Sequence, residues 1–157
     1  MKTYNNLYKT LCSLENLEKA FQKARKRKTQ KYYIIEFEKN LNENLFRLNQ
    51  ELTTQIYRPK PLTGFIIRDP KTRKIHASAF SDRVVYHAIV NILEPIYEKI
   101  FINDSYASRM NKGTHNAVLR FDKFKRKISS NGKLINNPYN NNSVKGFVLK
   151  ADIKHYA

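Results

Sequence analysis

The chain has 157 residues, which fits one domain that is long enough to bury a hydrophobic core. Its 30 Lys and Arg residues outnumber 13 Asp and Glu, and the resulting net charge of +17 favours a polyanion such as nucleic acid as the partner. One cysteine excludes a disulfide framework and suits a reducing cytoplasm, and the lack of a run of about 18 apolar residues excludes a membrane span.

Two helices are predicted near the N-terminus. Ser13 can cap the first, which has Glu15 in its first turn and ends in the basic run 25–28, where cations suit the helix dipole. The second spans about 33–56 and ends before the prolines of 58–61. Its apolar stripe recurs every three or four residues, as a core-facing helix requires, and consists of Phe37, Leu41, Leu45, Leu48, Leu52 and Ile56.

A cationic β-hairpin is predicted next. Residues 62–68 and 74–80 have the pattern of strands, and Asp69-Pro70-Lys71-Thr72 is typical of the turn between them. Lysines at hairpin ends often serve solubility alone. The apolar flanks and the net charge favour binding of a triphosphate or a nucleic-acid backbone, with Arg73 best suited to a bidentate grip. The cations concerned are Arg68, Lys71, Arg73 and Lys74.

Two more helices follow the hairpin. Ser81 or Asp82 can cap a helix whose apolar period runs from Val85 to Ile100, with a kink or restart at Pro95. A turn over 103–111 leads to a helix that begins near Thr114.

Cations flank both helix starts. Arg109, Lys112 and the Gly113-Thr114 helix start could seat a phosphate, although Gly113 could also serve only a tight turn. Arg83 could contact a nucleic-acid template or pair with Asp82 or Asp104.

The last predicted element is a buried strand over 147–153 that contains Asp152. An acid in an apolar strand is costly unless it is paired or binds a metal. Asp152 therefore either lies at the strand end, solvated or bridged to Lys150 or Lys154, or is a magnesium ligand for phosphoryl transfer. The sequence contains no partner strands for this element, so we expect a fragment, an interrupted reading frame or one part of a split protein.

Seven motifs in order resemble the N-terminal part of a bacterial reverse transcriptase. The retron, group II intron and diversity-generating retroelement enzymes form this group, the last being most similar, and the resemblance begins near Asn16. The motifs are Tyr57-Arg58-Pro59-Lys60-Pro61, Ile67-Arg68-Asp69-Pro70-Lys71-Thr72-Arg73-Lys74-Ile75, Asp82-Arg83-Val84-Val85-Tyr86-His87-Ala88, Leu93-Glu94-Pro95-Ile96-Tyr97-Glu98, Ser105-Tyr106-Ala107-Ser108-Arg109, Lys112-Gly113-Thr114-His115 and Leu149-Lys150-Ala151-Asp152-Ile153-Lys154-His155-Tyr156.

The resemblance implies an α+β fold, with helical and β-hairpin fingers of a right-hand polymerase at 1–145 and the first palm strand at 146–157. The implied activity is RNA-directed DNA polymerisation with Mg²⁺, an RNA template, a DNA primer and dNTPs. Asp152 matches a catalytic ligand of both magnesium ions, and the carbonyl of Ile153 a second metal contact. Arg73, helped by Lys71 or Arg68, matches the triphosphate-binding cations, whereas Arg83 and the segment from Arg109 through Lys112 and Gly113 to Thr114 match template contacts.

Two departures from the family matter. Ala157 occupies the nucleotide-binding position where the family has an aromatic sugar gate, and the Tyr-X-Asp-Asp motif is missing. We therefore expect the chain to bind nucleic acid without polymerising alone, in the cytoplasm. Its partner would be the C-terminal half of the polymerase or a basic accessory protein. The alternative is a non-catalytic, basic RNA-binding module or accessory protein.

Overall fold

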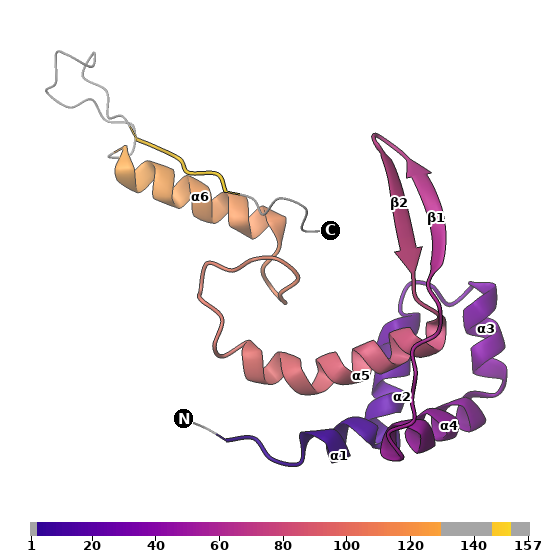
Figure 1. Ribbon diagram of the computed structural model, residues 1–157. Coiled ribbons are helices and arrows are strands. Elements are labelled where there is room, and N and C mark those ends of the chain that lie inside the picture. The colour runs from indigo at the N-terminus through magenta and orange to yellow at the C-terminus, as the bar shows by residue number, and fades with distance from the viewer. Residues whose placement is uncertain (1–2, 130–145, 152–157) are drawn as a thin grey trace, which may run out of the picture. The chain divides into compact units, whose positions relative to one another are not determined.

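The computed structural model describes residues 3–129 and 146–151, which belong to two compact units, Met1–Ile100 and Phe101–Ala157. The described residues form six helices and one antiparallel two-stranded hairpin (Figure 1), so the expected α+β class is confirmed. None of these helices is long and apolar enough to cross a membrane.

Five helices make up most of the first unit. They are α1 (Leu7–Cys12), α2 (Leu14–Arg25), α3 (Tyr32–Lys39), α4 (Leu41–Thr53) and α5 (Phe80–Tyr97). The hydroxyl oxygen of Ser13 accepts a hydrogen bond from the Asn16 amide at 3.3 Å, which confirms the expected cap of α2. The short helix α1 had no sequence prediction.

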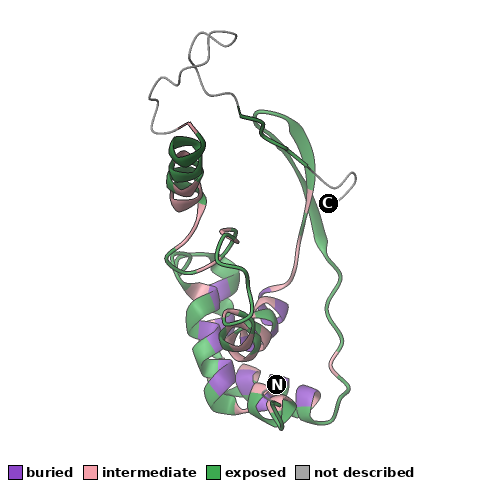
Figure 2. Ribbon diagram, turned by 90° about the vertical axis from the view of Figure 1, so that its left-hand side faces the viewer, coloured by how far each residue is buried: buried purple, intermediate pink, exposed green. Residues whose placement is uncertain are grey.

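All five helices contribute residues to the core of the first unit, and Figure 2 shows its buried residues in purple. Leu17, Phe21 and Val84 are completely buried there. The ring of Phe80 packs edge-on against the rings of Phe21 and Phe37, with centroid distances of 6.1 and 5.2 Å. This aromatic contact joins the first turn of α5 to α2 and α3.

The single helix predicted over 33–56 is wrong, because the chain breaks at Asn40. This residue has φ −120° and ψ 45°, outside the helical region, and separates α3 from α4. The Asn44 side-chain amide donates to the Phe37 carbonyl at 2.9 Å, which satisfies an acceptor left free at the end of α3. The apolar period continues across the break, so periodicity alone could not reveal it.

The prolines do not end α4. Gln55 adopts a left-handed conformation with φ 58°, and the amides of Gln55 and Ile56 donate to the carbonyls of Leu52 and Glu51, both at 3.0 Å. This is a Schellman cap. It ends the helix at Thr53 and leaves Ile56, expected in the apolar stripe, 66% exposed.

The hairpin comprises β1 (Thr63–Arg68) and β2 (Thr72–Ala77), paired in the register Thr63↔Ala77 to Arg68↔Thr72. Its second strand begins and ends earlier than predicted. Phe80, expected at the end of that strand, is the first residue of α5 and only 6% exposed, because its ring fills the core. Figure 1 shows the hairpin projecting away from the helices, and all six residues of β1 are exposed.

Helix α5 also differs from its prediction at both ends. Its N-cap is Ala79, which has no capping side chain, and Ser81 and Asp82 lie inside the first turn. The helix passes Pro95 and ends at Tyr97, so Ile100 is outside it and exposed.

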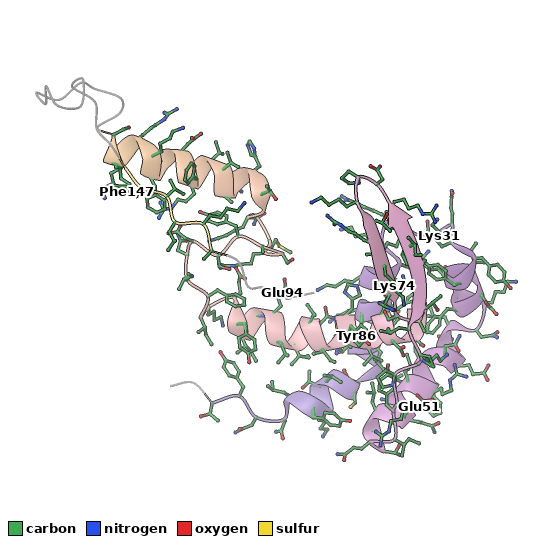
Figure 3. All side chains as sticks on the ribbon, turned by 45° about the horizontal axis from the view of Figure 1, so that its top comes forward. Lys31, Glu51, Lys74, Tyr86, Glu94 and Phe147 are labelled. Atoms are coloured by element: carbon green, nitrogen blue, oxygen red, sulfur yellow. The ribbon has the colours of Figure 1, made fainter. Side chains whose placement is uncertain are left out.

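The second unit contains α6 (Thr114–Ile128), which begins where the sequence predicts. None of its residues is buried. Residues 146–151 carry no strand, and Phe147, labelled in Figure 3, is 99% exposed, so the predicted buried strand is wrong over these residues. Residues 152 and 153 of that prediction lie outside the described part.

Candidate nucleic-acid interface

The register of the hairpin divides its cations between two faces. Residues directly paired across an antiparallel ladder project to the same face, and successive residues alternate. Arg68 therefore shares a face with Lys74, whereas Arg73 lies on the opposite face beside Ile67. Lys71 occupies the turn between the strands. The four predicted phosphate-binding cations gather at one end of the hairpin without forming a single cluster.

These four cations are available to a ligand. Arg68, Lys71, Arg73 and Lys74 are all exposed (Lys74 is labelled in Figure 3). None of their side chains forms a hydrogen bond or an ion pair with another described residue. Asp69 in the same turn forms no ion pair with them, so the four cations leave this end of the hairpin with a net positive charge.

A buried carboxyl group holds the chain segments that flank the hairpin. These segments, residues 57–62 before β1 and 78–82 after β2, are called the foot of the hairpin. Asp82 is 1% exposed, and its two oxygens accept hydrogen bonds from the Tyr57 hydroxyl at 2.7 Å and the Lys60 amide at 3.0 Å. Burial, and then the hydrogen bond to Asp82, raise the pKa of the Tyr57 phenol above its ordinary value. These contacts link the segment before β1 to the first turn of α5. The sequence suggested a helix cap at Asp82 or a pair with Arg83 and not these partners, because the tertiary partners of a buried acid leave no periodic signal.

Arg83 pairs with neither Asp82 nor Asp104. Its guanidinium lies over the rings of Tyr33 and Phe80, at 4.8 and 5.7 Å from their centroids, and donates to the Tyr33 hydroxyl at 3.4 Å. The side chain is half-buried, and its Nε has no partner among the described residues. Arg83 is therefore held flat on aromatic rings.

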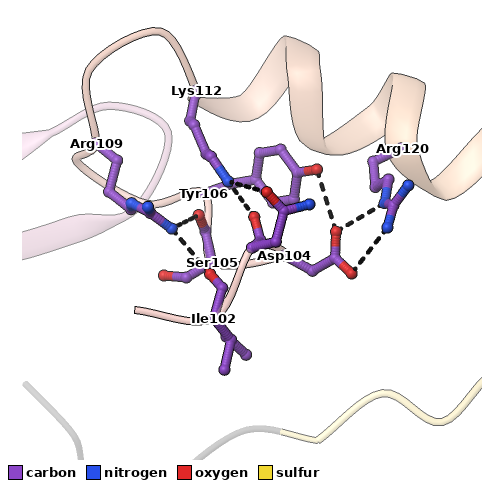
Figure 4. A network of polar contacts seen from close by, with 8 residues as sticks. Ile102, Asp104, Ser105, Tyr106, Arg109, Lys112 and Arg120 are labelled. Atoms are coloured by element: carbon purple, nitrogen blue, oxygen red, sulfur yellow. Dashed lines mark hydrogen bonds and ion pairs between the residues drawn. The ribbon is translucent and has the colours of Figure 1, made fainter. Parts of the chain in front are cut away.

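Arg109 and Lys112 are committed to the loop before α6 (Figure 4). Arg109 Nη1 donates to the carbonyls of Ile102 and Ser105, both at 2.9 Å. Lys112 Nζ donates to the Asn103 carbonyl and, at 3.3 Å, to its side-chain oxygen. These interactions give both cations a structural role in closing the loop, which the sequence pattern did not indicate.

Gly113 has the conformational role that the sequence left open. Its φ of 93° and ψ of 178° fall in a region essentially restricted to glycine, and its amide donates to the Tyr106 carbonyl at 3.0 Å. Thr114 follows as the first residue of α6 and is exposed.

Asp104 pairs with a cation of α6 and not with Arg83. It accepts from Arg120 Nε at 2.7 Å and Nη2 at 3.2 Å, which ties the loop to α6 (Figure 4). The hydrogen bond from Arg120 holds the pKa of the Asp104 carboxyl below its usual value.

A second group of available cations extends from the last turn of α2 to the start of α3. Arg25 pairs with Glu38 at 2.8 Å, but the other cations of 23–31 have no ion pair within the described residues. They are Lys23, Lys26, Arg27, Lys28 and Lys31. Burial, followed by the charges of Lys23 and Lys28, lowers the pKa of His87 on α5. The helix dipole, which we expected to explain the run 25–28, accounts for Arg25 in the last turn of α2 and not for the exposed loop beyond it.

The catalytic part of the expected site lies outside the described residues. Asp152 and Ile153, predicted as magnesium ligands, and Ala157, at the sugar-gate position, all belong to that part of the chain. Across 3–129 and 146–151, no three His, Cys, Asp or Glu side chains gather as a metal site requires.

Comparison of the sequence with protein-family models and with curated proteins finds no match.

Proposed function

We propose that this chain supplies the fingers of an RNA-directed DNA polymerase, where it binds a template and the phosphates of an incoming nucleotide. Its cationic hairpin would close on the triphosphate, and Asp152 with Mg²⁺ would belong to the palm. The ordered motifs from Tyr57 to Tyr156 support the polymerase assignment. When bound, the metal would activate the attacking oxygen and stabilise the leaving one.

One observation carries the proposal: a projecting hairpin ends in four exposed cations that form no ion pair with a described residue and that outnumber the one acid of the turn, Asp69. A cation that serves only the fold usually engages a carboxylate or a carbonyl, as Arg109 and Arg120 do. Leaving four together costs mutual repulsion unless an anion offsets it. Phosphate groups match them, since Arg forms bidentate contacts to phosphate and Lys acts as a point charge.

The two faces suggest a division of labour. Arg73, which has apolar neighbours on its face, would bind the triphosphate with help from Lys71. Arg68 and Lys74 on the other face would contact the nucleic-acid backbone. This refines the expectation that Arg68 helps Arg73, because the register separates the two side chains.

The template path differs from the sequence expectation. Arg109 and Lys112 would reach a template only after leaving the loop carbonyls, so they would shape this path without direct contact. Arg83 keeps its proposed template role, since stacking leaves part of its guanidinium available. The exposed cations of 26–31 add a candidate backbone contact.

Fluorescence anisotropy with a labelled RNA template and DNA primer tests the binding step. The double variant Lys71→Ala and Arg73→Ala should weaken binding of the primer–template and of a dNTP. Lys19→Ala with Lys125→Ala removes the same charge from residues already paired with Glu15 and Asp122, and should change little. If both double variants lose the same affinity, the hairpin contributes to binding only through its share of the net charge.

Catalysis is tested separately, because an RNA-binding module would also bind through the hairpin. The 157-residue chain alone should give almost no magnesium-dependent primer extension. In a polymerase that joins this region to a palm with Tyr-X-Asp-Asp, Asp152→Asn should abolish synthesis and keep template binding. Retained synthesis would reject the catalytic role of Asp152.

A further inference from the structure

The hairpin has few supports other than its foot. Every residue of β1 is exposed, and β2 has only intermediate or exposed residues, so the strands have no buried face to fix their direction. What holds the hairpin must therefore act where the chain enters β1 and where it leaves β2.

The exit from β2 is anchored by the core. Phe80 follows Ala77 by three residues, and its ring is enclosed by Phe21, Phe37 and Tyr33. The entry to β1 lacks such an anchor, since residues 58–62 are all exposed. A hairpin anchored only at the exit from β2 could still rotate about that segment.

The segment that enters β1 is anchored through a single backbone amide. Pro59 and Pro61 have no N–H group, and Lys60 between them donates to Asp82 at 3.0 Å. Among the described residues, no other backbone amide in 58–62 donates a hydrogen bond. Because the two prolines restrict φ around Lys60, fixing this amide also restricts the direction of the chain three residues later, where β1 begins at Thr63.

We propose that Asp82 is a positioning residue, which fixes the direction of the hairpin by holding the Lys60 amide and the Tyr57 hydroxyl at the first turn of α5. Asp82 itself contacts no ligand in this scheme. The importance of this direction for binding rests on the proposed function, because the cations at the hairpin end must meet a phosphate in a defined place.

Spin-label distances in the full chain test the proposal. Labels at Thr72→Cys in the hairpin and Gln50→Cys on α4, in a Cys12→Ala background, should give a narrow distance distribution. Asp82→Ala should broaden it. Asp82→Asn should keep it narrow, since the amide oxygen can accept from Lys60 and the amide nitrogen can donate to the Tyr57 oxygen. Tyr57→Phe loses one of the two contacts and should broaden the distribution less than Asp82→Ala.

Leu17→Ala is the matched control for stability, because Leu17 is fully buried in α2 and is not one of the residues that bond to Asp82. It should lower the thermal midpoint and leave the distribution narrow. A narrow distribution in Asp82→Ala, or equal broadening in Leu17→Ala, would overturn the positioning role. If Asp82→Ala fails to fold, a distribution in Tyr57→Phe as narrow as in the parent overturns it instead.

Binding of the RNA template, measured on the same variants without labels, separates this proposal from the proposed function. If the competent direction is populated about a tenth of the time in Asp82→Ala, the Kd should rise about tenfold. A broadened distribution with an unchanged Kd would support the positioning role and count against the hairpin as the binding element.

Discussion

Salt dependence measures directly how many hairpin cations contact phosphate. Each cation that neutralises a phosphate of single-stranded RNA adds about 0.7 to the slope of log K against log salt concentration. Arg68, Lys71, Arg73 and Lys74 are exposed and unpaired within the described residues, so in the absence of a dNTP, when Lys71 and Arg73 hold no triphosphate, all four can contact the RNA backbone. Replacing them together by Ala should reduce the slope by about 2.8, which from about 50 to about 200 mM salt corresponds to about a 50-fold smaller loss of affinity.

The assay is anisotropy with a labelled single-stranded RNA over a salt series. The doubles Arg68→Ala with Lys74→Ala and Lys71→Ala with Arg73→Ala separate the faces, and each should remove about half of the change if both faces contact the backbone. The paired control Lys19→Ala with Lys125→Ala should leave the slope unchanged. A quadruple variant with the wild-type slope would refute the reasoning that these cations meet phosphates.

Three further predictions concern stability. Phe80→Ala should cost about 3–5 kcal/mol in urea unfolding, whereas the exposed Phe46→Ala should cost about 1 kcal/mol or less; similar values would contradict the aromatic core. Gly113→Ala should cost about 1–3 kcal/mol through its backbone conformation alone, since no atom lies within 4 Å of the added Cβ, and an unchanged melting curve would argue against that conformation. Because the pKa of Tyr57 is raised, its stabilising effect is complete below pH 10.0 and is lost at higher pH, so unfolding free energy should fall more steeply above this pH in wild type than in Tyr57→Phe; parallel curves would exclude this contribution.

The starts of α2 and α6 were predicted from single residues at the helix ends, whereas the break at Asn40 and the end of α4 were not predicted. The cap of α2 follows from the Ser13 hydroxyl, and α6 begins after Gly113, which has a conformation that favours glycine. The break at Asn40 could not be predicted, because the apolar stripe stays in phase across it. The end of α4 at the left-handed Gln55 was hidden for a similar reason, since Gln has no special preference for that conformation.

The same distinction applies to the candidate site: features set by local sequence were predictable, and features set by tertiary contacts were not. Hairpin cations were predictable because a turn between two strands must lie outside the core. The partners of Arg109 and Lys112 are carbonyls, which every residue carries, so the sequence does not distinguish a cation that closes a loop from one that awaits a ligand. The contacts of Asp82 with Tyr57 and Lys60 join positions 25 and 22 residues apart, beyond the reach of any local pattern.

The length of the hairpin turns its foot into the fulcrum of a lever. Six residues per strand, at a rise of about 3.3 Å each, make an arm of about 20 Å. A tilt of about 10° at the base would sweep the far end through about 3.5 Å, more than the length of a hydrogen bond. A small change in the packing around the first turn of α5 would thus make or break a contact at the far end of the hairpin. The packing at α5 therefore controls where the hairpin end lies.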